Sequence, residues 1–206
     1  MLLAFEMNGQ PLPPQHGFPV RLLVPGWYGM TSVKWLRSID AVRAPFEGYQ
    51  QKVAYRYQKD ADDAGAPVSR IRIRSLLVPP GHPDFLTRHR LLEPGPAMLR
   101  GRAWSGNGPV VRVEVGIDGT WSEAALEPPA GPHAWQGFSY PWIAAPGIHE
   151  VACRAWDAAG SAQPLVQEWN VQGMGNNAVQ RIEVDVRRAG AGLANQSSAS
   201  QGLPSQ

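Results

Sequence analysis

The sequence predicts a mostly β protein built around a two-sheet sandwich of the immunoglobulin type. Three observations favour this class. The 206 residues include 22 glycines and 20 prolines, which indicates short extended segments joined by frequent turns. Apolar and polar residues alternate in several of these segments. The segments also recur at short intervals, each bounded by Gly, Pro, Asp or Asn, as in a sandwich.

The expected strands follow from this alternation. In the segment 110–117, Val111, Val113 and Val115 share one face, and Asp118-Gly119 predicts a tight hairpin turn. Arginines alternate with Ile71 and Ile73 in the segment 70–74, which predicts a half-buried strand there. The remaining strands are expected at 20–24, 97–103, 137–142, 149–155 and 180–186, with a further strand-like segment at 31–42.

The pattern divides the chain into three parts. Residues 1–66 contain short apolar runs and polar loops, and regular alternation begins after Pro67, so we expect a sandwich over residues 67–188. Residues 189–206 lack hydrophobic periodicity and are rich in Gly, Ser and Gln. Such a segment buries too little apolar surface to offset the entropy of ordering, which predicts a disordered tail.

Composition excludes several classes of function. The formal net charge of +2 argues against a nucleic-acid partner, which requires a clustered basic face. Cys153 is the single cysteine, so neither an intrachain disulfide nor the usual thiolate zinc site is expected. The histidines lack metal-ligand spacing. No signal peptide or membrane-spanning segment is recognised, so we expect a soluble chain, and no feature identifies a compartment.

One stretch, HGFPVRLLVPGWYGMTSVKW at residues 16–35, combines basic side chains with glycines and prolines. His16, Arg21 and Lys34 have the chemistry to converge on a phosphorylated ligand, and the glycines allow close approach of the backbone. The alternative is that the basic residues are solvated surface groups and that the tryptophans belong to a core. No Walker-type or dinucleotide-type glycine pattern accompanies the stretch.

The same stretch closely resembles a segment of the sulfite oxidase family of molybdopterin enzymes, which reads His-Gly-aromatic-Pro-apolar-Arg, then Pro-Gly-x-x-Gly, then Val-Lys-Trp. Downstream, GRAWSGNGPVVRVEVGIDGTW, CRAWDAAGSAQP and WNVQGMGNNAVQRIEV resemble the dimerisation domain of this family. The resemblance covers residues 1–188. It implies that residues 1–66 are a C-terminal fragment of an α+β molybdopterin-binding domain and that residues 67–188 are an immunoglobulin-like dimerisation domain.

The resemblance also implies which residues bind the cofactor. The pterin and phosphate of a molybdenum-molybdopterin cofactor are expected to contact His16, Arg21, Ser32, Val33 and Lys34. Trp35 is expected to pack beneath the loop, with a direct cofactor contact as the alternative.

Two departures from the family pattern affect the expected activity. The family ligates molybdenum through a cysteine that precedes this stretch, and residues 1–15 contain none, while Cys153 falls on an apolar strand of the sandwich. In the animal and plant sulfite oxidases an arginine that helps to hold the substrate stands where this chain has Gln172, and an amide lacks that charge. Arg181 is a nearby candidate for the missing charge, or an outward-facing strand residue.

We therefore expect the C-terminal portion of an oxidoreductase that performs oxo transfer to a small-molecule substrate, inactive alone because the cysteine segment is missing. The alternative hypothesis is a non-catalytic immunoglobulin-like dimerisation or interaction module. A homodimer is expected in both cases.

Overall fold

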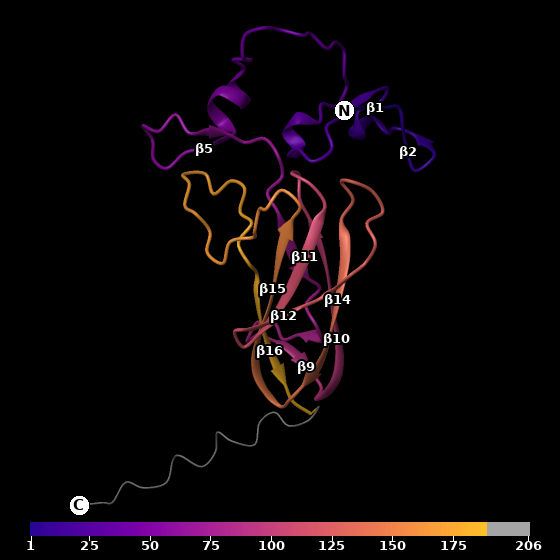
Figure 1. Ribbon diagram of the computed structural model, residues 1–206. Coiled ribbons are helices and arrows are strands. Elements are labelled where there is room, and N and C mark those ends of the chain that lie inside the picture. The colour runs from indigo at the N-terminus through magenta and orange to yellow at the C-terminus, as the bar shows by residue number, and fades with distance from the viewer. Residues whose placement is uncertain (189–206) are drawn as a thin grey trace, which may run out of the picture.

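The computed structural model describes residues 1–188 as an N-terminal block of short elements above a β-sandwich (Figure 1). We call residues 1–66 the N-terminal block and residues 67–188 the sandwich. The predicted tail, residues 189–206, lies outside the described residues. Within the described range, the helices are too short and too polar to span a lipid bilayer.

The sandwich consists of two mainly antiparallel sheets. The four-stranded sheet has the order β13(Ala125–Leu126), β14(Gln136–Ala144), β10(Gly95–Trp104) and β7(Arg74–Leu77). The six-stranded sheet has the order β12(Thr120–Glu123), β11(Val110–Ile117), β15(Gly147–Asp157), β16(Arg181–Val186), β9(Arg90–Leu92) and β8(His82–Pro83). The predicted mostly β class with an immunoglobulin-like sandwich is confirmed.

The core lies between the two sheets, and alternation along the strands produces it. Val113 and Val115 of β11 face inward with Val151 and Cys153 of β15, and Phe138 of β14 meets them from the opposite sheet. All five side chains are at most 1% exposed. Strands that alternate in this way bury one face and leave the other to solvent.

The hairpin between β11 and β12 turns at the predicted dipeptide. Asp118 and Gly119 have φ values of 51° and 82°, so both central residues adopt the left-handed region that a two-residue hairpin of this type requires. The predicted strands at 97–103, 110–117, 137–142, 149–155 and 180–186 correspond to β10, β11, β14, β15 and β16.

The N-terminal block is built from three small pairs of strands and three short helices. β1(Leu2–Ala4) pairs with β4(Arg21–Leu23), β2(Glu6–Met7) with β3(Gln10–Pro11), and β5(Arg56–Tyr57) with β6(Ala66–Pro67). The helices are η1(Pro14–His16), η2(Gly29–Thr31) and η3(Gln50–Ala54). The predicted strand at 20–24 corresponds to β4. The strand-like segment expected at 31–42 is not a regular strand, although its backbone bonds to Leu22 of β4 and to Val20, which precedes β4.

The strand expected at 70–74 begins later than predicted. The regular strand β7 covers Arg74–Leu77, because the preceding backbone bonds to loops instead of to a neighbouring strand. The Ile71 N–H donates to the Gly26 carbonyl at 2.9 Å, and the Gly106 N–H donates to the Ile71 carbonyl at 2.8 Å. The bond from Ile71 to Gly26 attaches the N-terminal block to the upper end of the sandwich.

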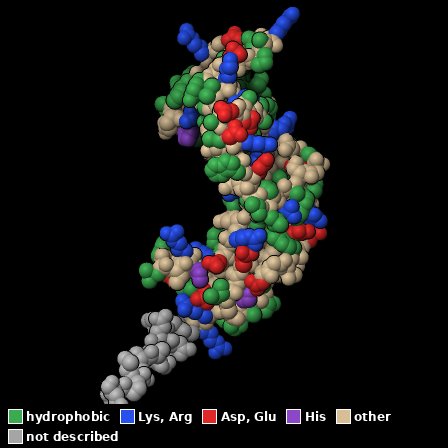
Figure 2. Space-filling view, turned by 90° about the vertical axis from the view of Figure 1, so that its left-hand side faces the viewer, with side chains coloured by type: hydrophobic (Ala, Val, Ile, Leu, Met, Phe, Trp, Pro, Cys, Tyr) green, Lys and Arg blue, Asp and Glu red, His purple; other side chains and the backbone are tan. Residues whose placement is uncertain are grey.

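The 158–180 loop, which connects β15 to β16, rises from the sandwich to lie beside β5 (Figure 1). The Val171 N–H donates to the Gln58 carbonyl at 2.8 Å, which fixes this contact between distant parts of the sequence. Figure 2 shows the molecule from the side as a curved body, with hydrophobic side chains gathered on the surface of the N-terminal block.

Candidate functional site

The candidate site is built from residues 14–36, which fold back on themselves around β4. The Leu22 N–H donates to the Val33 carbonyl at 2.8 Å, and the Leu36 N–H donates to the Val20 carbonyl at 2.9 Å. These two bonds place the segment 31–36 alongside β4. The short helix η1 precedes β4, so three separate pieces of the stretch meet in one place.

Gly17 lies where these pieces meet. Its φ of 108° belongs to a region that side chains disfavour. A Cβ added at Gly17 would lie 3.0 Å from Cβ of Lys34 and 3.2 Å from Cβ of Arg21. The glycine is therefore required both by its backbone conformation and by the close approach of two basic side chains.

The three basic residues predicted from the sequence are brought together around Gly17. Arg21 Nη1 donates to the carbonyl of His16 at 3.1 Å, and Lys34 Nζ donates to the carbonyl of Gln15 at 2.9 Å. The Arg21 Nε is buried and has no hydrogen-bond partner among the described residues. A buried guanidinium N–H without an acceptor is costly, which indicates that an acceptor is still to be supplied.

Ser32 contributes to this site through its side-chain hydroxyl, and Val33 contributes through its backbone carbonyl. Ser32 Oγ accepts a hydrogen bond from the Val24 N–H at 3.3 Å, and the Val33 carbonyl accepts the bond from Leu22. The Val33 side chain is 47% exposed. The two residues thus hold the segment against β4 and present an exposed surface next to Lys34.

Trp35 does not pack beneath the loop, so that prediction is wrong. The side chain is 61% exposed, and Nε1 donates to the Pro14 carbonyl at 2.8 Å. Its φ of 51° turns the chain outward, and Lys34 Nζ lies 5.9 Å from the ring centroid. The indole therefore links the segment 31–36 to Pro14 at the surface and does not belong to a core.

These features fit a bound phosphorylated group. Arginine and lysine are the side chains that recognise phosphate, and a glycine cradle permits close approach of the ligand to the backbone. The unpartnered Arg21 Nε and the close packing around Gly17 are both present here. The arrangement supplies positive charge and hydrogen-bond donors.

The two predicted substrate residues lie in different settings. Gln172 occupies an exposed turn of the 158–180 loop. Arg181 begins β16 and forms an ion pair with Glu150 of β15, on the exposed face of the sheet. The structure therefore does not join Arg181 to Gln172 through any contact between described residues.

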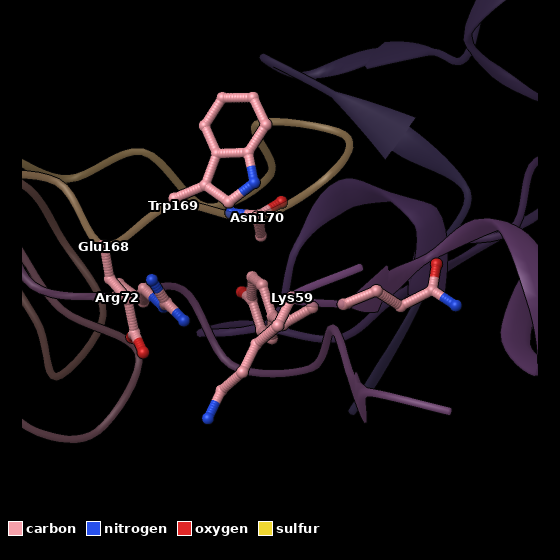
Figure 3. Close-up of a pocket in the computed structure, with 7 residues that line it drawn as sticks. Lys59, Arg72, Glu168, Trp169 and Asn170 are labelled. Carbon is pink, nitrogen blue, oxygen red and sulfur yellow. The ribbon is translucent and has the colours of Figure 1, made fainter. Parts of the chain in front are cut away.

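A cleft that the sequence did not predict lies between the N-terminal block and the 158–180 loop. Figure 3 shows Trp169 and Asn170 above Lys59, with Arg72 and Glu168 close together at the left. The sequence pattern predicts Arg72 only as part of a half-buried strand. The signal available in the sequence was the run of arginines at 70, 72 and 74, because alternate residues of an extended segment share a face.

Cys153 is excluded from the site by its position. The thiol is buried in the sandwich core, and burial raises its pKa to about 11. Within residues 1–188, no group of three or more His, Cys, Asp or Glu side chains is arranged to hold a metal ion.

Comparison with known proteins identifies the family of the chain. Residues 1–50 match the family model of the oxidoreductase molybdopterin binding domain, and residues 66–187 match that of the Mo-co oxidoreductase dimerisation domain. The chain is 36% identical over 215 residues to nitrate reductase [NAD(P)H] of Hordeum vulgare, and 34% identical over 217 residues to inducible nitrate reductase [NADH] 2 of Glycine max. Each match covers 91% of this chain and 24% of the relative.

Among solved structures, the sulfane dehydrogenase SoxCD from Paracoccus pantotrophus superposes with a TM-score of 0.75 and 28% sequence identity. The match covers 91% of this chain and 51% of that chain. The chain thus spans about a quarter of the length of the curated relatives. The predicted molybdenum-molybdopterin cofactor of the intact enzyme is confirmed at the level of the family. The chain belongs to the sulfite oxidase family of molybdopterin oxidoreductases.

Proposed function

We propose that this chain is the C-terminal portion of a molybdopterin-dependent oxidoreductase, in which the N-terminal block forms one side of the cofactor site. His16, Arg21, Ser32, Val33 and Lys34 contact the pterin and phosphate. The observation that carries the proposal is the convergence of Arg21 and Lys34 on Gly17, with a buried Arg21 Nε that lacks an acceptor within residues 1–188. The bound cofactor supplies oxo-transfer chemistry, and these residues orient and neutralise it.

The division of the chain into parts belongs to the same proposal. Residues 1–66 are a fragment of the cofactor domain, and residues 67–188 are a dimerisation domain that forms a homodimer. Light scattering on the purified chain at micromolar concentration measures this directly. A dimer is expected, and a monodisperse monomer contradicts it.

The substrate is a small molecule, and Gln172 lies on the loop that faces it. The ion pair between Arg181 and Glu150 supports the alternative in which Arg181 is an outward strand residue. Gln172 therefore contributes a neutral amide where a guanidinium stands in the animal and plant sulfite oxidases. An amide offers one N–H₂ group and no charge, which favours a substrate contact weaker than an ion pair.

The chain by itself is inactive in this proposal, because its one cysteine is confined to the sandwich core. The alternative function is a non-catalytic dimerisation module. The observation that favours this alternative is the location of the hydrophobic core, which lies within the sandwich.

The test uses a longer form of the protein that contains the complementary part of the cofactor domain. Arg21→Ala is expected to lower the molybdenum and pterin bound per chain, because each charge-assisted hydrogen bond contributes about 1.5–3 kcal/mol. Metal analysis and pterin fluorescence measure the occupancy. Arg100→Ala, on the exposed face of β10, is the matched control and leaves the occupancy unchanged. Equal occupancy in the two variants removes Arg21 from the site.

A further inference from the structure

We propose that Met30 and Met174 form a site of reversible methionine oxidation, and that oxidation there weakens the attachment of the 158–180 loop to the N-terminal block. The two side chains line one hollow of about 250 Å³. Met30 belongs to the N-terminal block and Met174 to the loop, so the hollow lies where the two segments meet. The site contains none of the residues assigned to the cofactor above and does not depend on them.

The hollow is mainly apolar and opens to solvent. Besides the two thioethers, it is lined chiefly by Tyr28, Tyr55 and Val68. Methionine suits such a position, because its flexible and polarizable side chain fills irregular spaces. Both methionines are half-buried, so a small oxidant such as hydrogen peroxide has access to them through the opening.

The backbone of Met174 is held in place by the buried side chain of Asn170. Asn170 Oδ1 accepts a hydrogen bond from the Met174 N–H at 2.8 Å, and Asn170 Nδ2 donates to the Met174 carbonyl at 2.9 Å. The Gly173 N–H donates to the Asn170 carbonyl at 3.0 Å, which closes the turn between the two residues. Because its backbone is bonded on both sides, Met174 has little freedom to withdraw from the hollow by itself.

The loop lies close against the N-terminal block on both sides of Met174. A Cβ added at Gly175 would lie 2.7 Å from Cε1 and Oη of Tyr57. On the other side, the Val171 N–H donates to the Gln58 carbonyl at 2.8 Å. A change in the Met174 side chain therefore acts on a contact that holds the loop to the block from two directions.

The chemical step is a two-electron oxidation of the thioether by hydrogen peroxide. The methionine sulfur attacks one peroxide oxygen, an S–O bond forms as the O–O bond breaks, and one water molecule is released. The sulfur is thereby oxidised to a sulfoxide and the peroxide is reduced to water. Methionine sulfoxide reductases reverse the modification, so the site is able to return to its original state.

A sulfoxide at Met30 or Met174 places a polar acceptor in an apolar hollow. Burial of a polar group without a partner is unfavourable, and hydration of the group removes this cost. Separation of the loop from the N-terminal block provides that hydration, so the oxidised chain is expected to detach the loop more often. The loop also carries Gln172, so detachment would move this residue away from the substrate; this one consequence rests on the function proposed above.

The other three methionines have different surroundings. Met1, Met7 and Met98 are 77%, 40% and 50% exposed. Met98 lies on the outer face of β10, where water hydrates a sulfoxide without any change in packing. Oxidation of Met98 is therefore expected to leave the loop attached, which makes this residue the matched control.

The test treats the full 206-residue chain with hydrogen peroxide and locates each sulfoxide by peptide mass spectrometry. Hydrogen exchange then compares the oxidised and untreated chains. Exchange in residues 165–178, which include the Val171 N–H bonded to Gln58, is expected to become at least about tenfold faster, while β11 and β15 remain unchanged. Treatment with methionine sulfoxide reductases A and B is expected to restore the original rate.

Three variants separate this site from general oxidative damage. Met30→Leu combined with Met174→Leu keeps the apolar volume, and slow exchange is expected before and after peroxide. Met98→Leu is expected to respond to peroxide as the wild-type chain does. Met174→Gln introduces a polar group without an oxidant and is expected to accelerate exchange in residues 165–178 by itself.

Unchanged exchange in residues 165–178 after oxidation of Met30 and Met174 overturns the proposal. Equal acceleration in the wild-type chain and in the double leucine variant also overturns it, and so does peroxide treatment that oxidises Met98 but neither residue of the hollow. None of these results bears on molybdenum occupancy, which tests the proposed function separately.

Discussion

The N-terminal block and the sandwich differ in where their large apolar side chains lie. Among the buried hydrophobic residues, Leu12 alone precedes residue 67, whereas Leu2, Phe5 and Phe46 are 57%, 61% and 70% exposed. In the sandwich, strands from both sheets enclose one continuous cluster. The first region thus leaves apolar surface uncovered, and the second encloses its own core.

The two regions therefore obtain their stability in different ways. Burial of apolar surface is the dominant favourable term in folding, so the sandwich is expected to fold by itself. The N-terminal block has little core of its own and is held by backbone bonds to the sandwich, such as the one from the Ile71 N–H to the Gly26 carbonyl. The matched family model for that block describes a cofactor-binding domain, and the proposed cofactor contacts lie within it.

The largest expected effect is on the reactivity of the Cys153 thiol, which is compared between the native and the unfolded chain. Its thiol is buried, and a pKa of about 11 leaves little thiolate at neutral pH. Labelling by a thiol reagent is expected to be at least about 10³-fold slower in the native chain than in the urea-unfolded chain, because reaction requires opening of the core. Stopped-flow absorbance measures both rates. Rapid labelling of the native chain contradicts the placement of Cys153 in the core.

Replacement of one phenylalanine in each region compares how much a buried and an exposed side chain contribute to the stability. Phe138→Ala is expected to destabilise the sandwich by about 3–5 kcal/mol, because it empties a site that is 1% exposed in the core. Phe5→Ala removes the same side chain from an exposed position in the N-terminal block, and a change within about 0.5 kcal/mol is expected. Urea unfolding monitored by circular dichroism measures both. Similar losses in the two variants would show that the block shares the cooperative core.

His149 lies at the lower end of the sandwich, and its replacement is expected to change the stability only slightly. Nδ1 lies 2.7 Å from Asp118 Oδ2, and Nε2 lies 2.9 Å from the Ala145 carbonyl. Because both partners are acceptors, the ring is favoured with both nitrogens protonated. The hydrogen bond to Asp118 is the main cause that raises the pKa of His149, and the same bond lowers the pKa of Asp118.

The sign of the pH dependence follows from these directions. The contribution of His149 is fully present below its unfolded pKa of 6.5 and is lost as the pH rises through the raised folded value. The contribution of Asp118 is present above its unfolded pKa of 3.8 and is lost as the pH falls through the lowered folded value. His149→Gln is therefore expected to cost a few tenths of a kcal/mol at pH 5 and less at pH 9. Thermal melting at the two pH values measures this, with His82→Gln as the control; an equal or larger cost at pH 9 contradicts it.

Much of the sandwich was predictable because its strands carry their pattern locally. Val111, Val113 and Val115 lie on one strand as expected, but burial falls on Val113 and Val115, while Val111 is 53% exposed next to a register shift between β11 and β15. Alternation predicts which residues of a strand share a face, but it does not reveal a register shift. The late start of β7 has a similar cause, since Ile71 bonds to Gly26 and Gly106 from distant segments.

The candidate site was predictable only where its residues lie in one stretch. His16, Arg21 and Lys34 meet because β4 and the segment after it pair locally. The cleft around Arg72 draws on segments near residues 57, 72 and 168, and no local pattern relates them. Trp35 was misplaced because a positive φ at a tryptophan is rare and reverses the direction that alternation would give.

We propose that the N-terminal block contacts the cofactor and that the sandwich does not. Hydrogen exchange measured by mass spectrometry on the longer protein, with and without bound molybdopterin, tests it most directly. We expect cofactor to slow exchange in residues 14–36 by at least about tenfold and to leave β10, β11 and β14 unchanged. Unchanged exchange in residues 14–36 on cofactor binding would contradict the account.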